Sequence, residues 1–134
     1  MSTSREAGRP SRLLIVDDER DNRELLEIIL TRAGYEIATA ASGAEALAIV
    51  AKRPPDLVLL DVMMPEMDGY EVAARLKSSG VAIFVIMVSA HDDRSARLRA
   101  QNVGADDFVA KPVDRAELCA RIKNLLCDNR AVTS

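Results

Sequence analysis

Short runs of apolar residues alternate along the chain with longer segments that are apolar on one side only. The short runs are mostly continuous, as expected for strands that are buried on both faces of a sheet. The longer segments repeat their apolar positions at the spacing of an α-helix. The predicted strands are Arg12 to Val16, Tyr35 to Ala40, Leu57 to Leu60, Ala82 to Val88 and Asp106 to Ala110. The predicted helices are Arg20 to Ala33, Ser42 to Arg53, Asp68 to Ser78, Asp92 to Val103 and the segment that follows Asp114.

Capping residues mark where several of these helices begin and end. Three helices open with an acceptor side chain and a glutamate three positions later, which is the spacing of a capping box. The pairs are Ser42 with Glu45, Asp68 with Glu71 and Asp114 with Glu117. Gly34 fits the position just after the first helix, and Pro54-Pro55 ends the second.

Strand and helix alternate five times along the chain, which predicts an α/β fold. Parallel strands joined by helices form a sheet that is covered on both faces, so we expect a five-stranded, doubly wound (βα)5 sheet. Right-handed crossovers bring the carboxyl ends of all strands to one edge of such a sheet. Ligands of open α/β sheets bind at that edge, and a functional site is expected there.

Polar residues stand at the ends of four predicted strands. Asp17 and Asp18 follow the first strand, Asp61 ends the third, Ser89 follows the fourth and Lys111 follows the last. A single aspartate at a strand end is ordinarily a cap for a neighbouring turn, and Asp61 alone would be interpreted in that way. Three carboxylates, a hydroxyl and an ammonium group on one edge instead predict a site.

The residue types in this set suit phosphoryl transfer. Clustered carboxylates repel one another unless a cation lies between them, and hard oxygen ligands of this kind suit Mg²⁺. A carboxylate beside Mg²⁺ can act as a nucleophile toward phosphorus. Lys111 would supply charge for phosphoryl oxygens, and Ser89 a hydrogen-bond donor. The first strand is followed neither by a glycine-rich dinucleotide fingerprint nor by a Gly-Lys-Ser/Thr loop, so nucleotide binding there is not expected.

Composition and charge argue against several other classes of protein. The 134 residues are enough for one domain, and 49% of them are hydrophobic. A formal net charge of −3 gives no electrostatic basis for binding nucleic acid or an anionic membrane. No membrane span or signal peptide is recognisable, and Cys119 and Cys127 stand too far apart on one predicted helix for a disulfide. A cytoplasmic location is expected.

The motifs at the strand ends resemble the receiver domain of bacterial two-component response regulators, the CheY-like family. The resemblance rests on Asp17-Asp18, on Asp61 with the segment Met63 to Gly69, on Ser89-Ala90 and on Lys111-Pro112. It covers roughly Arg12 to Leu126 and implies a flavodoxin-like fold. We expect residues 1–11 to be a disordered lead-in, 12–127 the receiver domain and 128–134 a C-terminal tail.

The resemblance implies that Asp61 is the phosphoacceptor and that its donor is a histidine kinase or a phosphotransfer protein. Asp18 and Asp61 would bind Mg²⁺ directly together with the Met63 carbonyl, and Asp17 would bind it mainly through water. The protein would not be an enzyme, except that it would take part in its own Mg²⁺-dependent phosphorylation and dephosphorylation.

The same resemblance assigns the other polar residues of the edge. Ser89 would contact the phosphoryl group, Lys111 would pair with it, and the Lys111-Pro112 bond would be cis. Phe108 stands where the family often has a tyrosine, and with Ser89 it would form the switch; as a core aromatic it needs no such role, and both interpretations can hold. Met63 and His91 would flank the phosphoryl group, although His91 is more simply a loop residue than a phosphorelay histidine.

The signal is expected to leave through a face made of the helix from Asp92, the strand from Asp106 and the final helix. Its outward charges look like those that pair across a two-fold axis in receivers of transcription factors: Arg97, Asp106, Asp107, Glu117, Arg121 and Lys123. A solvated charged face is the simpler interpretation. A closed symmetric contact is the commonest kind of dimer, and a weak homodimer tightened by phosphorylation is predicted. The output protein is not identified, and neither nucleic acid nor a membrane is an expected partner.

Two alternatives stay open. A pseudo-receiver would act as a protein-interaction module without phosphate, although the intact acids, Ser89 and Lys111 argue against it. The chain would also fit the receiver fragment of a larger regulator, since Ala105 to Val109 is similar to receivers attached to transcription factors and diguanylate cyclases. A DNA-binding output domain is not expected within this chain, because only Asn129 to Ser134 follow the last helix.

Overall fold

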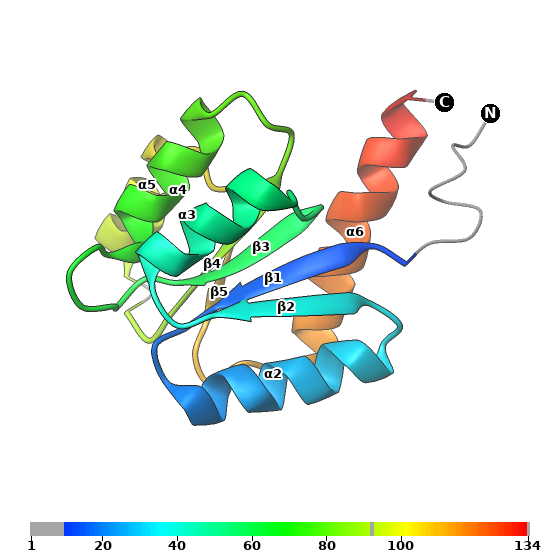
Figure 1. Ribbon diagram of the computed structural model, residues 1–134, viewed down its shortest axis with the longest axis horizontal. Helices are drawn as coiled ribbons and strands as arrows, with labels where there is room; N and C mark the ends of the chain where they lie inside the picture. The colour runs from blue at the N-terminus through cyan, green and yellow to red at the C-terminus, as the bar shows by residue number, and fades with distance from the viewer. Residues whose placement is uncertain (1–9, 92, 134) are drawn as a thin grey trace.

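A central sheet lies between two layers of helices (Figure 1). The computed structural model describes residues 10–91 and 93–133, with side chains as far as Cys127. In chain order the elements are β1 (Arg12–Val16), α2 (Arg20–Arg32), β2 (Glu36–Ala40), α3 (Gly43–Lys52), β3 (Leu57–Asp61), α4 (Gly69–Ser78), β4 (Phe84–Ser89), α5 (Arg94–Asn102), β5 (Asp107–Ala110) and α6 (Arg115–Thr133). Strand and helix alternate as the apolar pattern predicts.

All strands run parallel, in the order β2-β1-β3-β4-β5. The central strand β3 pairs with β1, where Leu57 lies opposite Leu13, and with β4, where Asp61 lies opposite Val88. Helices α3, α4 and α5 cover one face of the sheet, and α2 and α6 cover the other (Figure 1). This arrangement confirms the predicted doubly wound α/β fold, with the flavodoxin-like strand order.

The central strand β3 shows why the apolar runs are continuous. Val58 and Leu60 pack in the cluster beneath α3, α4 and α5, whereas Leu57 and Leu59 pack in the cluster beneath α2 and α6. All four side chains are at most 1% exposed. Burying a side chain of this size contributes about 1.5–3 kcal/mol. Both faces of β3 therefore favour apolar residues until the strand ends at Asp61.

Side-chain caps fix the starts of three helices as predicted. Each acceptor side chain binds the backbone N–H three residues later: Ser42 to Glu45 at 3.1 Å, Asp68 to Glu71 at 3.0 Å and Asp114 to Glu117 at 3.4 Å. The Glu45 carboxylate in turn accepts a hydrogen bond from the Ala41 N–H at 2.7 Å. Gly34 follows α2 with a φ of 102°, a conformation that favours glycine.

Three strands begin later than the sequence pattern predicts, and the first of them, β2, begins at Glu36 rather than Tyr35. β4 begins at Phe84 rather than Ala82, and β5 begins at Asp107 rather than Asp106. Asp106 already bonds to Val85 through its own N–H and through its carboxylate, both at 2.8 Å. The Asp106 carboxylate thus accepts a hydrogen bond that a backbone carbonyl would accept between regular strands. The pattern of apolar residues does not reveal this replacement.

Helix α5 begins after Asp93, whose carboxylate accepts a hydrogen bond from the Ala96 N–H at 2.8 Å. The predicted start at Asp92 lies outside the described residues. Most of the predicted lead-in, residues 1–9, also lies outside them. Helix α6 continues to Thr133, past the predicted end of the domain at residue 127. Within the described part of the chain, no helix is both long enough and apolar enough to cross a membrane.

Candidate functional site

The loops at the carboxyl edge of the sheet surround a cavity of about 250 Å³. β1 leads into Asp17, β3 ends at Asp61, β4 ends at Ser89 and β5 leads into Lys111. The cavity is lined by Asp18, Glu19, Asp61, Met63, Ala90, His91 and Lys111. The topology therefore brings together the acids and the lysine that the sequence places at separate strand ends.

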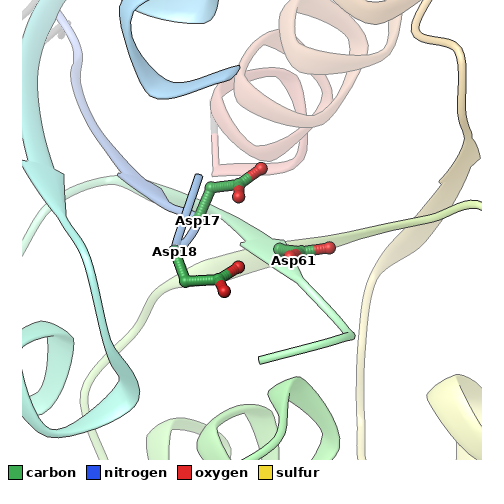
Figure 2. A group of neighbouring side chains, drawn as sticks. All are labelled: Asp17, Asp18 and Asp61. Atoms are coloured by element: carbon green, nitrogen blue, oxygen red, sulfur yellow. The ribbon is translucent and has the colours of Figure 1, made fainter. Parts of the chain in front are cut away.

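Asp17, Asp18 and Asp61 lie together at the ends of β1 and β3 (Figure 2). Oxygen atoms from the three carboxylates lie within 4.8 Å of one another. Asp17 and Asp61 are 3% and 5% exposed, whereas Asp18 is open to solvent. Like charges at this spacing repel, so the cluster favours either a bound cation or the uptake of a proton.

Lys111 is a cation that faces this cluster. Its Nζ lies 3.3 Å from Asp61 Oδ1 and 3.6 Å from Asp17 Oδ2. The Lys111–Pro112 bond is cis, as the resemblance implies. One ammonium group does not neutralise three carboxylates, so these four side chains keep an excess of negative charge.

The surroundings shift the pKa values of both Asp61 and Lys111. Burial, followed by repulsion from Asp17, raises the pKa of Asp61 above its ordinary 3.8, although attraction from Lys111 and a hydrogen bond from the Met63 backbone act in the opposite direction. Desolvation lowers the pKa of Lys111, but attraction from Asp61 and Asp17 outweighs it and leaves that pKa above 10.5. Lys111 therefore stays charged at neutral pH, next to a carboxylate that is poorly solvated.

The acidic loop after β1 is held by residues that sequence analysis did not single out. The Glu19 N–H donates to Asp17 Oδ1 at 2.9 Å, and the Arg23 guanidinium donates to the Asp17 carbonyl at 2.8 Å. The Asn22 amide donates to the Glu19 carboxylate at 2.6 Å. Glu19 also lines the cavity. The position of Glu19 directly after two aspartates could have indicated that it belongs to the acidic site. The contact of Arg23 depends on how α2 packs and has no such signal in the sequence.

Gly69 brings the start of α4 against the backbone of Asp61. Its N–H donates to the Val62 carbonyl at 2.9 Å. A Cβ atom at this position would lie 2.8 Å from Val62 Cα and closer still to the Asp61 carbonyl oxygen. Only glycine fits without displacing the backbone, which gives a physical reason for the Asp-Gly pair at the start of this helix.

Ser89 and Met63 differ in how far they are exposed to solvent. Ser89 is fully buried, and its hydroxyl accepts a hydrogen bond from the His91 N–H at 3.0 Å. The cavity itself is lined by the two residues that follow, Ala90 and His91. Met63 lies at the rim of the cavity and is 59% exposed. The roles predicted for Ser89 and for the Met63 carbonyl stay predictions.

The other predicted switch residue, Phe108, lies in the core beneath α3, α4 and α5 and is 6% exposed. The Arg97 guanidinium lies 4.9 Å from the centroid of its ring. In the pairing of β4 with β5, Ser89 lies opposite Ala110. Because side chains alternate along a strand, Phe108 and Ala110 share a face of β5. The structure thus places Ser89 and Phe108 in one region, with Phe108 packed inside.

Charges of the predicted signalling face are paired within the chain. The pairs are Lys77 with Asp106 at 2.9 Å, Arg121 with Asp107 at 2.6 Å and Arg121 with Glu117 at 2.9 Å. The hydrogen bonds that Arg121 donates to Asp107 and then to Glu117 raise the pKa of its guanidinium above the ordinary value. A symmetric dimer that used these charges would therefore have to exchange existing ion pairs for new ones.

Comparison with known sequences places this site in a family. The response regulator receiver domain family matches residues 13–123. Response regulator MprA of Mycobacterium sp. (strain KMS) is 44% identical over 117 residues, which make up 87% of this chain and 51% of MprA. Response regulator PleD of Caulobacter vibrioides (strain NA1000 / CB15N) is 44% identical over 117 residues, 86% of this chain and 26% of PleD. The chain thus spans about half the length of MprA and about a quarter of PleD.

Solved structures show the same likeness. The CheY-like response regulator receiver domain protein of Methanospirillum hungatei JF-1 is 30% identical, with a TM-score of 0.86, and the match covers 91% of this chain and 98% of that one. A chain of the CheX-CheY-BeF3-Mg complex from Borrelia burgdorferi is 33% identical, with a TM-score of 0.85, covering 90% of this chain and 92% of that one. The chain described here belongs to the response regulator receiver domain family of two-component systems.

Proposed function

We propose that this receiver domain accepts a phosphoryl group on Asp61 from a phosphohistidine and thereby controls a partner protein. The observation that carries the proposal is the buried Asp61 carboxylate, with two more carboxylates within 4.8 Å and the Lys111 ammonium at 3.3 Å. A pseudo-receiver that only binds other proteins would gain nothing from this costly concentration of charge. The donor would be a histidine kinase or a phosphotransfer protein.

The acid cluster fits Mg²⁺ as the resident cation. The three carboxylate oxygens lie close enough for one ion to contact, and an all-oxygen donor set suits Mg²⁺ better than softer metals. Asp18 and Asp61 would bind it directly with the Met63 carbonyl, and Asp17 mainly through water. When bound, Mg²⁺ would offset the negative charge that phosphoryl oxygens add to an already acidic site.

In the proposed transfer, one carboxylate oxygen of Asp61 forms a bond to phosphorus while the bond between phosphorus and the donor imidazole nitrogen breaks. The electron pair of the broken bond stays with the imidazole. Lys111, which lies 3.3 Å from Asp61, would then pair with a phosphoryl oxygen. The Ser89 hydroxyl accepts a hydrogen bond from His91, so its own proton is available for a phosphoryl oxygen.

A second, largely apolar cavity of about 500 Å³ beside the site supports docking of the donor. It is lined by Asp17 and Lys111 of the site, and most of its apolar residues come from α2 and from the segment before α6: Leu25, Leu26, Ile29, Pro112 and Val113. Leu25 is 58% exposed, which leaves it accessible to a partner. Transfer requires the donor imidazole within bonding distance of Asp61, so a helix that carries the phosphohistidine would occupy this cavity.

The proposed output is a change in the face formed by α5, β5 and α6. The phosphoryl group would draw the Ser89 hydroxyl toward it, and Phe108 would move into the space released. Arg97 of α5 packs on the Phe108 ring, so a movement of Phe108 would displace α5 directly. The output partner is a protein, and a phosphorylation-enhanced homodimer through the same face is the second candidate, one that needs the in-chain ion pairs of Arg121 to be exchanged.

The test is phosphoryl uptake from acetyl phosphate with Mg²⁺, followed by intact-protein mass. We expect one added phosphoryl group in the wild type, none in Asp61→Asn and none in the presence of EDTA. The matched control is Asp21→Asn, because Asp21 is an exposed acid in the first turn of α2, and it should behave as the wild type. Uptake at the normal rate in Asp61→Asn would disprove the assignment. A wild type that takes up no phosphoryl group and shows no NMR response to beryllofluoride would favour the pseudo-receiver.

A further inference from the structure

The first turn of α4 is fastened to α5 by contacts that the proposed switch does not use. Tyr70, which is 7% exposed, donates its hydroxyl hydrogen to the Ala96 carbonyl of α5 at 3.3 Å. Arg99 of α5 reaches back, with its guanidinium 4.2 Å from the centroid of the Tyr70 ring and 3.6 Å from the Asp68 carboxylate. We name these four residues, Asp68, Tyr70, Ala96 and Arg99, the α4–α5 clasp.

The α4 side of the clasp adjoins the phosphoacceptor through the backbone. Gly69 lies between Asp68 and Tyr70, and its N–H donates to the Val62 carbonyl at 2.9 Å. A Cβ atom at Gly69 would lie too close to the Asp61 carbonyl oxygen for any side chain to fit. A shift of the backbone at Asp61 therefore displaces the start of α4, because close-packed atoms transmit displacement.

The α5 side of the clasp belongs to a helix with little buried surface. Ala100 is its one buried residue, so packing against the sheet alone fixes its position weakly. Side-chain contacts toward two neighbouring elements supply the rest: Arg97 on Phe108 of β5, and Arg99 with Tyr70 of α4. Elements with few buried contacts shift at low cost, so these two contacts and the Tyr70 bond to Ala96 contribute to where α5 lies.

We propose that Arg99 is a positioning residue that couples the loop after Asp61 to α5, in parallel with the Ser89–Phe108 switch. The proposal rests on the proposed phosphorylation of Asp61. Rearrangement of the loop on phosphorylation would move Asp68 and Tyr70, and the clasp would carry that movement to α5 from the α4 side. A cation held both by a ring face and by a carboxylate keeps its orientation better than either contact alone would allow.

Arg99→Gln tests the clasp, with Arg94→Gln as the matched control. Arg94 opens the same helix, is exposed and lies on the side of β5, where it lines the cavity between α5 and β5. The measurement is the change in backbone amide NMR shifts on adding beryllofluoride and Mg²⁺, with Gly69 reporting binding and Ala96 and Ala100 reporting α5. We expect a full response at Gly69 in all three proteins, and a response of α5 that falls by about twofold or more in Arg99→Gln alone.

A second variant separates coupling from mere stability. Tyr70→Phe removes the hydroxyl bond to Ala96 and keeps the ring, so it should fold normally and reduce the α5 response less than Arg99→Gln does. Thermal unfolding of each variant without beryllofluoride gives the stability for comparison, and Arg99→Lys, which keeps the charge near Asp68, should restore part of the response. If Gly69 responds fully and α5 responds as in the wild type in both Arg99→Gln and Tyr70→Phe, the coupling is disproved. If Gly69 fails to respond even in the wild type, the proposed phosphorylation fails first, and the coupling with it.

Discussion

The two edges of the sheet each carry a cluster of charged side chains, and they balance the charge in opposite ways. At the amino edge, the Arg12 guanidinium donates to the Arg53 carbonyl at 2.6 Å and lies 3.3 Å from the Glu36 carboxylate. The Arg12 backbone N–H donates to the Asp56 carboxylate at 2.7 Å, and the Arg53 guanidinium lies 3.1 Å from Glu36, so carboxylates lie beside donors and cations in this cluster. At the carboxyl edge, three carboxylates crowd within 4.8 Å, and the cation at 3.3 Å from one of them is a single lysine.

The difference shows what each edge is for. Opposite charges that lie beside one another stabilise the native state without a bound ligand. Like charges held together raise the free energy of the empty domain, and a ligand of opposite charge or a proton lowers it again. The same sheet geometry produces both edges, because every strand of a parallel sheet begins at one and ends at the other. The imbalance at the carboxyl edge, rather than the presence of charge, identifies the site.

Asp61→Asn should have the largest effect, and its effects on function and stability should have opposite signs. We expect phosphoryl uptake to be lost, while the domain without Mg²⁺ becomes more stable by on the order of 1 kcal/mol, because the amide removes a buried charge and its repulsion from Asp17. Urea unfolding measures the gain. With added Mg²⁺ the wild type should become the more stable of the two proteins, since binding of the ion stabilises its folded state. A variant less stable than the wild type without Mg²⁺ would contradict the contrast between the edges.

Arg12→Gln should do the reverse at the amino edge. We expect a loss of about 2 kcal/mol in stability, because the Arg53 carbonyl loses its donor and the Glu36 carboxylate loses one of its two guanidinium partners. Phosphoryl uptake should not change. Arg20→Gln is the control, since Arg20 is 80% exposed and pairs with Glu24 on one helix face; it should cost less than about 0.5 kcal/mol. A large change of uptake in Arg12→Gln would show that the two edges are not independent.

The stability difference between the wild type and Asp61→Asn should depend on pH. The pKa of Asp61 is raised above 3.8 by folding, so the folded wild type holds a proton over a range in which the unfolded chain has lost it. Its stability therefore falls as pH rises from 3.8 through the folded pKa. The advantage of Asp61→Asn should be full above the folded pKa of Asp61 and should shrink as pH falls toward 3.8. Urea midpoints of both proteins across this range, without Mg²⁺, measure it, and a difference that stays constant would be inconsistent with the raised pKa.

The residues of the carboxyl edge were predictable from the sequence because topology alone places them there. Asp17, Asp18, Asp61 and Lys111 each stand at a strand end, and a parallel sheet has to gather strand ends. The position of Gly69 was likewise readable from the capping box that begins with Asp68. These features depend on the backbone, whose path follows from the alternation of strand and helix.

Contacts between side chains of different helices could not be predicted in this way. The bond from Arg23 to the Asp17 carbonyl and the stacking of Arg99 on Tyr70 depend on rotamers and on how neighbouring helices pack. The charges expected on the signalling face show the same limit. Arg121 was expected to face solvent or a second copy; its side chain is 36% exposed, and the pair that it forms with Asp107 of its own chain was not foreseen.

Glu36→Gln should have the smallest effect on stability. It tests how much of the contribution of Arg12 comes from its pair with the partly exposed Glu36 carboxylate. The Glu36 carboxylate lies 3.3 Å from the Arg12 guanidinium and 3.1 Å from that of Arg53, but its side chain is 40% exposed. Water and salt screen such a carboxylate, so its loss should cost only about 0.5 kcal/mol, and less at high ionic strength. Arg12 keeps the Arg53 carbonyl as an acceptor in this variant. Urea unfolding at low and high salt measures the loss of stability. A loss as large as that of Arg12→Gln would mean that the Glu36 carboxylate is the main source of stability in this cluster. A loss that depends on Mg²⁺ would mean that the carboxyl edge and the amino edge are coupled.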